Sequence, residues 1–352
     1  PLSLEFPDAY AVSVHPPQDG EDIGAEGIRQ AFVDPVGTPR LAELARGRRS
    51  AVITVDDIAR PTPAYRVIPS ILEELHAAGI QDDAIKFLLA VACHRPMVRD
   101  DMIKKLGEEI VRKYYVVNHN PYEYLAYVGT TSRGTPVHVS RHFAEAEVRI
   151  GIGQIAPHGI PGFSGGAKIV LPGVAGMETI AANHRPGGFK GGITKIEGNE
   201  FRADMEEAAQ LAGLHMIVNL ILTSRRGIAA MVVGDPVAAH RRAVDLAWGI
   251  MSTPLPPEPV DIGVFNQYPK DTEFMHVSHA LHVLSSAQRP LVKRGGTIVV
   301  LSASPVGFGV HSLQGRHMPQ ESLRVSPRFE PYRVVLLCPT INRRQLPPIY
   351  PA

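Results

Sequence analysis

The chain has 352 residues, 44% of them hydrophobic and 20% charged, and its 36 Lys and Arg residues nearly balance 35 Asp and Glu residues. This composition indicates a folded globular protein and gives no basic excess for nucleic-acid binding. The two cysteines, Cys93 and Cys338, are too few for a disulfide framework or a zinc site built from cysteines. No apolar run reaches the ~18–20 residues that span a bilayer. The sequence therefore predicts a cytoplasmic protein with neither nucleic acid nor membrane as partner.

Short β-branched runs alternate along the chain with longer helical patterns, which predicts an α/β fold. Before residue 252 the predicted strands cover 51–55, 86–93, 148–152 and 216–223, and the predicted helices cover 65–78, 100–113, 203–214 and 236–250.

A proline-rich segment follows this first run of elements. Thr253–Pro259 has four prolines in seven residues, and because proline lacks an amide donor and fixes φ, the segment is predicted to be a linker. The alternation then resumes, with strands predicted at 261–265, 297–302 and 334–338 and a helix at 272–294. We therefore predict two α/β domains, a large one over residues 1–252 and a smaller one over 260–352.

Two groups of polar residues follow predicted strands, where ligands bind in open α/β sheets. Asp57 and Arg60 come after the first strand, and an arginine stiffened by Pro61 suits contact with a carboxylate or phosphate; a structural Asp–Arg pair is the alternative. His94 comes after the second strand, where it suits acid–base chemistry; a buried histidine bonded to a backbone carbonyl is the alternative.

The segment 157–168 (PHGIPGFSGGAK) combines four glycines with His158 and Lys168. Glycines let backbone amides approach an anion closely, so the segment predicts an anion-binding loop, with a plain glycine-rich turn as the alternative. It is not a Walker A motif, because Ala167 separates the last glycine from Lys168 and Ile169 follows the lysine.

One further histidine, His184, follows His158 by 26 residues. Imidazole is a common ligand of nickel, zinc and copper, so His184 could return to the same cleft as a metal ligand. A histidine at a helix end is the alternative.

These elements together resemble the nickel-dependent lactate racemase family of 2-hydroxy acid racemases and epimerases. The resemblance covers most of residues 45–250 and rests on DDIARPTP at 56–63, CHRP at 93–96, PHGIPGFSGGAKIVLPG at 157–173 and NH at 183–184. It implies two α/β domains with the active site in the cleft between them. It also implies a nickel-pincer nucleotide (pyridinium-3,5-bisthiocarboxylic acid mononucleotide nickel), which separate cofactor-synthesis proteins make.

The resemblance assigns a role to each residue by position. Lys168 matches the lysine that is covalently tethered to the cofactor, His184 matches the nickel ligand, and His94 and His158 match the acid–base pair. Arg60 matches a substrate-binding position, and the residues expected to hold the rest of the cofactor, with its phosphate in the glycine loop, are Asp57, Gly162, Ser164, Gly165 and Gly166. The implied reaction inverts C2 of a 2-hydroxy acid by hydride transfer to and from the cofactor, while the histidines move the hydroxyl proton.

The second half of the chain departs from the family pattern. Where the family has a glutamine and a lysine near the substrate carboxylate, this chain has His276 and His279. We therefore expect these histidines to contact a substrate other than lactate alone, such as a larger 2-hydroxy acid or a sugar acid. An ordinary helix face is the alternative for the two residues.

Two other functions remain open on the sequence. A zinc-dependent hydrolase could use His276, His279 and His282, which follow one another at intervals of three residues. A nucleotide- or anion-binding module without catalysis could use the glycine loop alone.

Overall fold

The computed structural model describes residues 4–185, 187–313, 329–342 and 344. Its largest sheet has six strands in the order β10-β9-β6-β1-β2-β3, all parallel except β10, which runs antiparallel to β9 at one edge. Parallel sheets are normally covered on both faces, and β1 is buried over its first five residues. The six strands are β1 (Ala51–Asp56), β2 (Ile85–Ala90), β3 (Tyr115–Asn118), β6 (Val148–Gln154), β9 (Met216–Leu222) and β10 (Ile228–Gly234).

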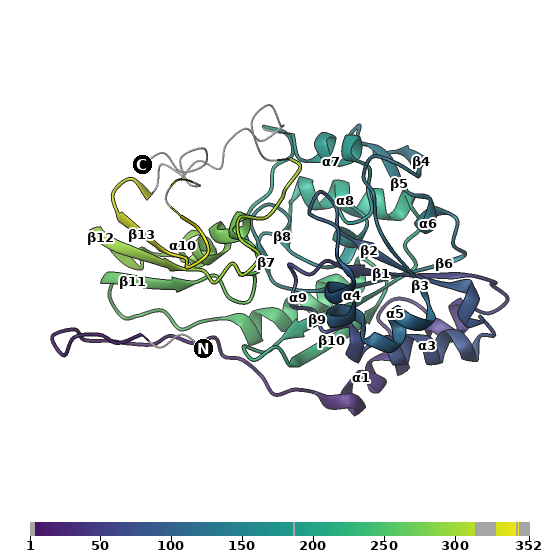
Figure 1. Cartoon of the computed structure of the whole chain (residues 1–352), viewed down its shortest axis with the longest axis horizontal. Helices are drawn as coiled ribbons and strands as arrows, with labels where there is room; N and C mark the ends of the chain where they lie inside the picture. Colours follow the sequence, from purple (N-terminus) through teal and green to yellow (C-terminus); the bar gives the residue numbers. More distant parts are fainter. Residues whose placement is uncertain (1–3, 186, 314–328, 343, 345–352) are drawn as a thin grey trace.

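Helices pack on both faces of this sheet (Figure 1). Successive side chains of a strand point to opposite faces, and accordingly Val52 packs in one hydrophobic core and Ile53 in the other. The core that contains Ile53 also contains residues of α1 (Gly24–Val33), α2 (Leu41–Leu44), α3 (Ile68–Ala77), α4 (Arg99–Leu106) and α5 (Glu108–Lys113). The core that contains Val52 also contains residues of α6 (Arg141–Ala144), α7 (Met177–Asn183), α8 (Glu200–Leu211) and α9 (Ala238–Met251).

The strands and helices predicted for this part are present, although the helix predicted over 65–78 is a 3-10 turn, Ala64–Arg66, followed by α3, and two other elements differ clearly in their bounds. The strand predicted over 86–93 ends at Ala90, because the chain turns at 91–94, where the amide of His94 donates to the carbonyl of Val91. The helix predicted over 100–113 is two helices, α4 and α5, separated by Gly107 at φ 93°, a left-handed conformation that an α-helix cannot continue through.

A second, three-stranded parallel sheet follows, in the order β11 (Val260–Asn266), β12 (Val292–Leu301), β13 (Arg333–Leu337). The single helix predicted over 272–294 is wrong. The chain forms a 3-10 helix, η4 (Phe274–Leu281), and a short α10 (His282–Ser286), and then enters β12. Pro290 prevents a helix from running through to residue 294, because proline cannot donate into a helix and disfavours helical backbone in the residue before it.

Short elements complete the described chain. They are the antiparallel pair β4 (Leu125–Thr130) and β5 (Pro136–Ser140), the two-residue pair β7 (Pro157–His158) and β8 (Gly162–Phe163), and the 3-10 helices η1 (Ala64–Arg66), η2 (Asp82–Ala84) and η3 (Gly166–Ile169).

The two sheets are joined by residues 252–259, which form neither helix nor strand. An N-terminal arm passes beside the start of this connection, where the amides of Gln18 and Asp19 donate to the carbonyls of Ser252 and Ile250. The division into domains over 1–252 and 260–352 stays a prediction, and residues 345–352 lie outside the described chain. Within the described residues, none of the helices combines the length and apolar character needed to cross a bilayer.

Candidate active site

A cavity of about 210 Å³ lies at the carboxyl ends of β1, β2 and β6 and beside β9, and η4 and the loop at 311–313 close its other side. This volume far exceeds the ~15 Å³ that one water needs, so it can accommodate a ligand. All of the predicted site residues except Gly162 line it, namely Asp57, Arg60, His94, His158, Ser164, Gly165, Gly166, Lys168, His184, His276 and His279. The residues that line the cavity therefore come both from the part of the chain that forms the six-stranded sheet and from the part that forms the three-stranded sheet.

Asp57 and His94 form a hydrogen-bonded pair at the ends of β1 and β2. The Nδ1 atom of His94 lies 2.5 Å from Oδ2 of Asp57. Burial opposes ionisation of Asp57, but His94, Arg60 and Lys105 outweigh it and lower the pKa of this carboxyl well below its usual range. An ionised carboxylate on Nδ1 fixes the orientation of the ring and leaves Nε2 to react.

Four histidine rings follow one another along the cavity wall. The ring centroids are 5.0 Å apart for His94 and His276, 5.8 Å for His276 and His279, and 5.5 Å for His279 and His158. In a 3-10 helix, residues i and i+3 eclipse one another, which places His276 and His279 on one edge of η4. The row thus joins the two histidines that the sequence suggested as acid and base.

The imidazoles of His158, His276 and His279 have a lowered pKa and are therefore neutral at neutral pH. Burial is the main cause that holds the pKa of His158, His276 and His279 well below its usual value, and nearby positive charges add to it. A neutral imidazole has one N–H donor and one lone pair. The Nδ1 atoms of His158 and His276 are buried without a hydrogen-bond partner within the described chain, and so is Nη1 of Arg60.

The glycine loop is held mainly by its own protein contacts. Gly165 and Gly166 have φ angles of 78° and 59°, and a Cβ on Gly165 would come within 2.4 Å of Ile155. The amide of Gly166 donates to Oδ1 of Asn219 (3.0 Å), and Ser164 donates its amide to Ala156 O and its hydroxyl to Gln154 O. These amides are therefore already bonded, and Gly162 does not line the cavity. The phosphate-binding role of the loop stays a prediction.

Lys168, on η3, reaches the same cavity. Among the described residues its Nζ atom has no hydrogen-bond or ion-pair partner. Burial first, then the positive charges of Arg60 and Arg202, lower the pKa of Lys168 to about 7. The ε-amine is therefore largely neutral, and hence nucleophilic, just above neutral pH.

The rate at which Lys168 reacts with acetic anhydride should accordingly rise with pH with a midpoint of about 7, because the reactive neutral amine forms above the lowered pKa. The exposed Lys190 is the internal control, and its midpoint should lie near the ordinary ~10.4 of lysine. Peptide mapping after brief labelling at graded pH gives both values. Equal midpoints for the two lysines would show that the amine of Lys168 is not activated.

His184 lies directly after α7 with one ring nitrogen already used. Its Nδ1 atom is 3.0 Å from the carbonyl oxygen of Ile180, which can only accept, so Nδ1 carries the proton and Nε2 keeps a lone pair. Burial and the charge of Lys168 lower the pKa of His184 to about 3. An edge contact with Phe201, at 4.8 Å between ring centroids, fixes the ring further. This arrangement leaves Nε2 of His184 as the ring nitrogen that could bind a metal.

Sequence reasoning missed three residues beside this site. Lys270 is buried with its Nζ atom 3.5 Å from Nδ1 of His279, and Cys93 and His311 contact each other at the end of β2. Lys270 and His311 belong to no motif or periodic pattern, and Cys93 stands in the CHRP segment without a role of its own, so only their position near the cavity reveals them.

Comparison with known proteins adds a family to this geometry. The model of the lactate racemase N-terminal domain matches residues 1–190, more than half of the chain. The chain is also 32% identical over 308 residues to the lactate racemase of Lactiplantibacillus plantarum, an alignment that covers 85% of this chain and 71% of that protein. The chain belongs to the lactate racemase family.

A second lactate racemase and two solved structures are also similar to this chain. The lactate racemase of Thermoanaerobacterium thermosaccharolyticum is 29% identical over 294 residues, covering 82% of this chain and 67% of that protein. The structure of its apoprotein matches with a TM-score of 0.73 and 27% identity over 87% of this chain and 73% of that one. A Thermotoga maritima protein, with a TM-score of 0.62 and 21% identity over 80% of this chain and 71% of that one, shares the fold. Membership of the lactate racemase family supports an isomerase of the racemase type.

Proposed function

We propose that this member of the lactate racemase family is a 2-hydroxy acid racemase or epimerase that works with a lysine-tethered nickel-pincer nucleotide. The observation that carries the proposal is that Lys168, His184, His94 and His158, from three separate segments, line one cavity. A small-molecule 2-hydroxy acid is the substrate, and separate synthesis proteins supply the cofactor.

The residues present fit the cofactor. The neutral amine of Lys168 is suited to covalent attachment, and Nε2 of His184 has a lone pair for nickel. The orphaned donors Arg60 Nη1 and Asn219 Nδ2 are buried and belong to residues that line the cavity, where an anionic group would satisfy them. When bound, the nickel-pincer nucleotide supplies an acceptor for the hydride of C2.

The protein moves the proton of the substrate hydroxyl. His94, oriented by Asp57, has Nε2 available to take that proton, and neutral His158 has a lone pair for the same task at the other end of the histidine row. Inversion requires a proton transfer for each enantiomer, so two histidines at opposite ends of one row suit a reaction that runs in both directions.

The substrate is held by Arg60, His276 and His279 in this proposal. Arg60 offers a buried, unpartnered guanidinium nitrogen to the carboxylate. The neutral imidazoles of His276 and His279 donate and accept hydrogen bonds without adding charge. Such a wall suits additional hydroxyl groups, so we propose a 2-hydroxy acid larger or more polar than lactate.

The two other functions receive less support. Within the described residues, His276, His279 and His282 are not among the groups spaced to hold one metal ion, so the zinc-hydrolase hypothesis loses its ligand set. A module that only binds anions would not need an activated lysine or the Asp57–His94 pair.

Racemisation in D2O tests the proposed chemistry. The hydrogen of C2 should be retained, because it moves as hydride and does not exchange with water, whereas abstraction as a proton would introduce deuterium. The measurement is mass spectrometry of the product from cofactor-loaded enzyme with a panel of 2-hydroxy acids. Deuterium at C2 after a single conversion would contradict hydride transfer.

A further inference from the structure

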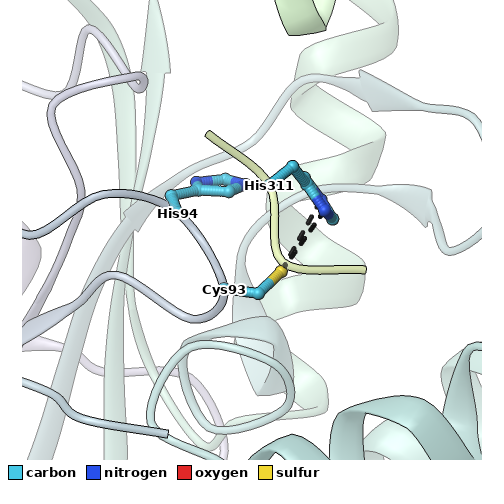
Figure 2. Close-up of side chains that lie close together, drawn as sticks. All are labelled: Cys93, His94 and His311. Carbon is cyan, nitrogen blue, oxygen red and sulfur yellow. Dashed lines mark hydrogen bonds between the residues drawn. The ribbon is translucent and has the colours of Figure 1, made fainter. Parts of the chain in front are cut away.

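Cys93, His94 and His311 gather at one end of the cavity. One possible ligand atom from each lies within 4.8 Å of the others, and Sγ of Cys93 is 3.6 Å from both ring nitrogens of His311. Figure 2 shows the Cys93 and His94 side chains, from adjacent positions after β2, directed toward His311 on a separate segment. Within the described chain, this is the only set of three or more His, Cys, Asp or Glu residues so spaced.

The backbone holds the two segments together. His94 and His311 form an antiparallel bridge, and the amide of Ser312 donates to the carbonyl of Cys93 at 2.8 Å. A second link crosses nearby, where Nε of Arg95 lies 3.2 Å from the buried carboxylate of Glu273. The three side chains are thus placed by fixed backbone contacts.

The separation of Cys93 and His311 matches that of two ligands on one metal ion. Zn–S bonds of about 2.3 Å and Zn–N bonds of about 2.0–2.1 Å, at a tetrahedral angle, separate sulfur and nitrogen by roughly 3.6 Å. Cys93 and His311 already have this separation. The possible ligand atoms of all three residues lie within 4.8 Å of one another, so His94 has to move closer to share the ion.

The surroundings of His94 also suit a metal. Its Nδ1 atom is bonded to Asp57, so Nε2 is the nitrogen left to coordinate, and a carboxylate on the far nitrogen is the usual outer partner of a metal-bound histidine. One thiolate with two imidazoles favours a borderline-soft divalent ion. The low number of cysteines excludes a site built from several of them, but not this mixed set.

We propose that Cys93, His94 and His311 form a second transition-metal site, separate from His184, that binds a divalent ion of the Zn²⁺ class. The Cys93 Sγ–H bond breaks as the Sγ–metal bond forms, the proton passes to water, and no oxidation state changes. All three residues line the cavity, so the fourth position opens into it. An ion bound there occupies Nε2 of His94, which then cannot accept a substrate proton; this consequence rests on the proposed function.

Co²⁺ titration of the cofactor-free 352-residue chain tests the site, with cobalt as a coloured substitute for zinc. We expect one cobalt per chain with a thiolate-to-cobalt charge-transfer band, and Zn²⁺ should displace the cobalt and remove the band. Cys93→Ser should abolish the band, and His311→Ala should weaken cobalt binding at least ~100-fold, because losing a direct ligand should cost no less than the ~10–100-fold typical of an outer-shell partner.

Two variants serve as matched controls. Cys338→Ser removes the other free cysteine and His184→Ala removes the proposed nickel ligand, and both should keep the band. A band that survives Cys93→Ser, an undiminished affinity in His311→Ala, or loss of the band in His184→Ala would overturn the proposal. If Cys93→Ser does not fold by circular dichroism, the result for His311→Ala decides. Because no cofactor or substrate is used, failure of the racemase proposal leaves this test intact.

Discussion

Replacing Lys168 by alanine is expected to abolish covalent cofactor attachment and reduce racemisation to background. The amine of Lys168 has the lowered pKa, near about 7, that a nucleophilic lysine requires, and its side chain reaches the same cavity as His184. Intact-protein mass spectrometry under mild conditions, followed by peptide mapping, should show a nucleotide-sized adduct with nickel on the peptide that contains Lys168 in the protein without the substitution. The variant should show no such adduct. Both proteins should be produced with nickel and the cofactor-synthesis proteins.

Lys190→Ala is the control for this experiment, because Lys190 is exposed and lies on a nearby loop. It should keep both the adduct and the activity. A Lys168→Ala protein that still carried the adduct and racemised would refute the tether. An unmodified Lys168 in a protein that retains no nickel would favour the anion-binding module instead.

His94→Ala and His158→Ala should each lower kcat for racemisation by about 10²–10⁴-fold, the usual contribution of a general acid or base. Because both residues serve one catalytic cycle, the double variant should be little worse than the more damaged single variant. The measurement is the initial rate in both directions from each enantiomer, together with the mass of the adduct. The adduct should persist in both variants, since neither residue is the proposed tether or nickel ligand.

His76→Ala is the matched control for the histidine variants. His76 is a half-exposed residue on α3 whose Asp82 contact lies at the surface, where an ion pair contributes little. The kcat of the His76→Ala variant should stay unchanged. An unchanged kcat in His94→Ala or His158→Ala, with the adduct intact, would remove that histidine from the acid–base pair.

The main strands and their order along the chain could be predicted because their signals are local. The apolar runs that form β1, β2, β6 and β9 can be recognised from a few consecutive residues. The rule that ligands bind at the carboxyl ends of parallel strands then placed Asp57 and His94 at a site. The 272–294 segment shows the limit, since its apolar spacing suited a helix but the chain there packs as a 3-10 turn against β12.

The chemistry of the site was decided by contacts between residues far apart in the sequence. No local pattern shows that the amide of Gly166 is bonded to Asn219, that Lys168 is buried beside Arg60, or that His311 reaches Cys93. The sequence by itself thus determined which residue types follow which strands. Only the tertiary structure decided which of them share one cavity and which pKa values shift, because burial and nearby charges come from segments that the fold brings together.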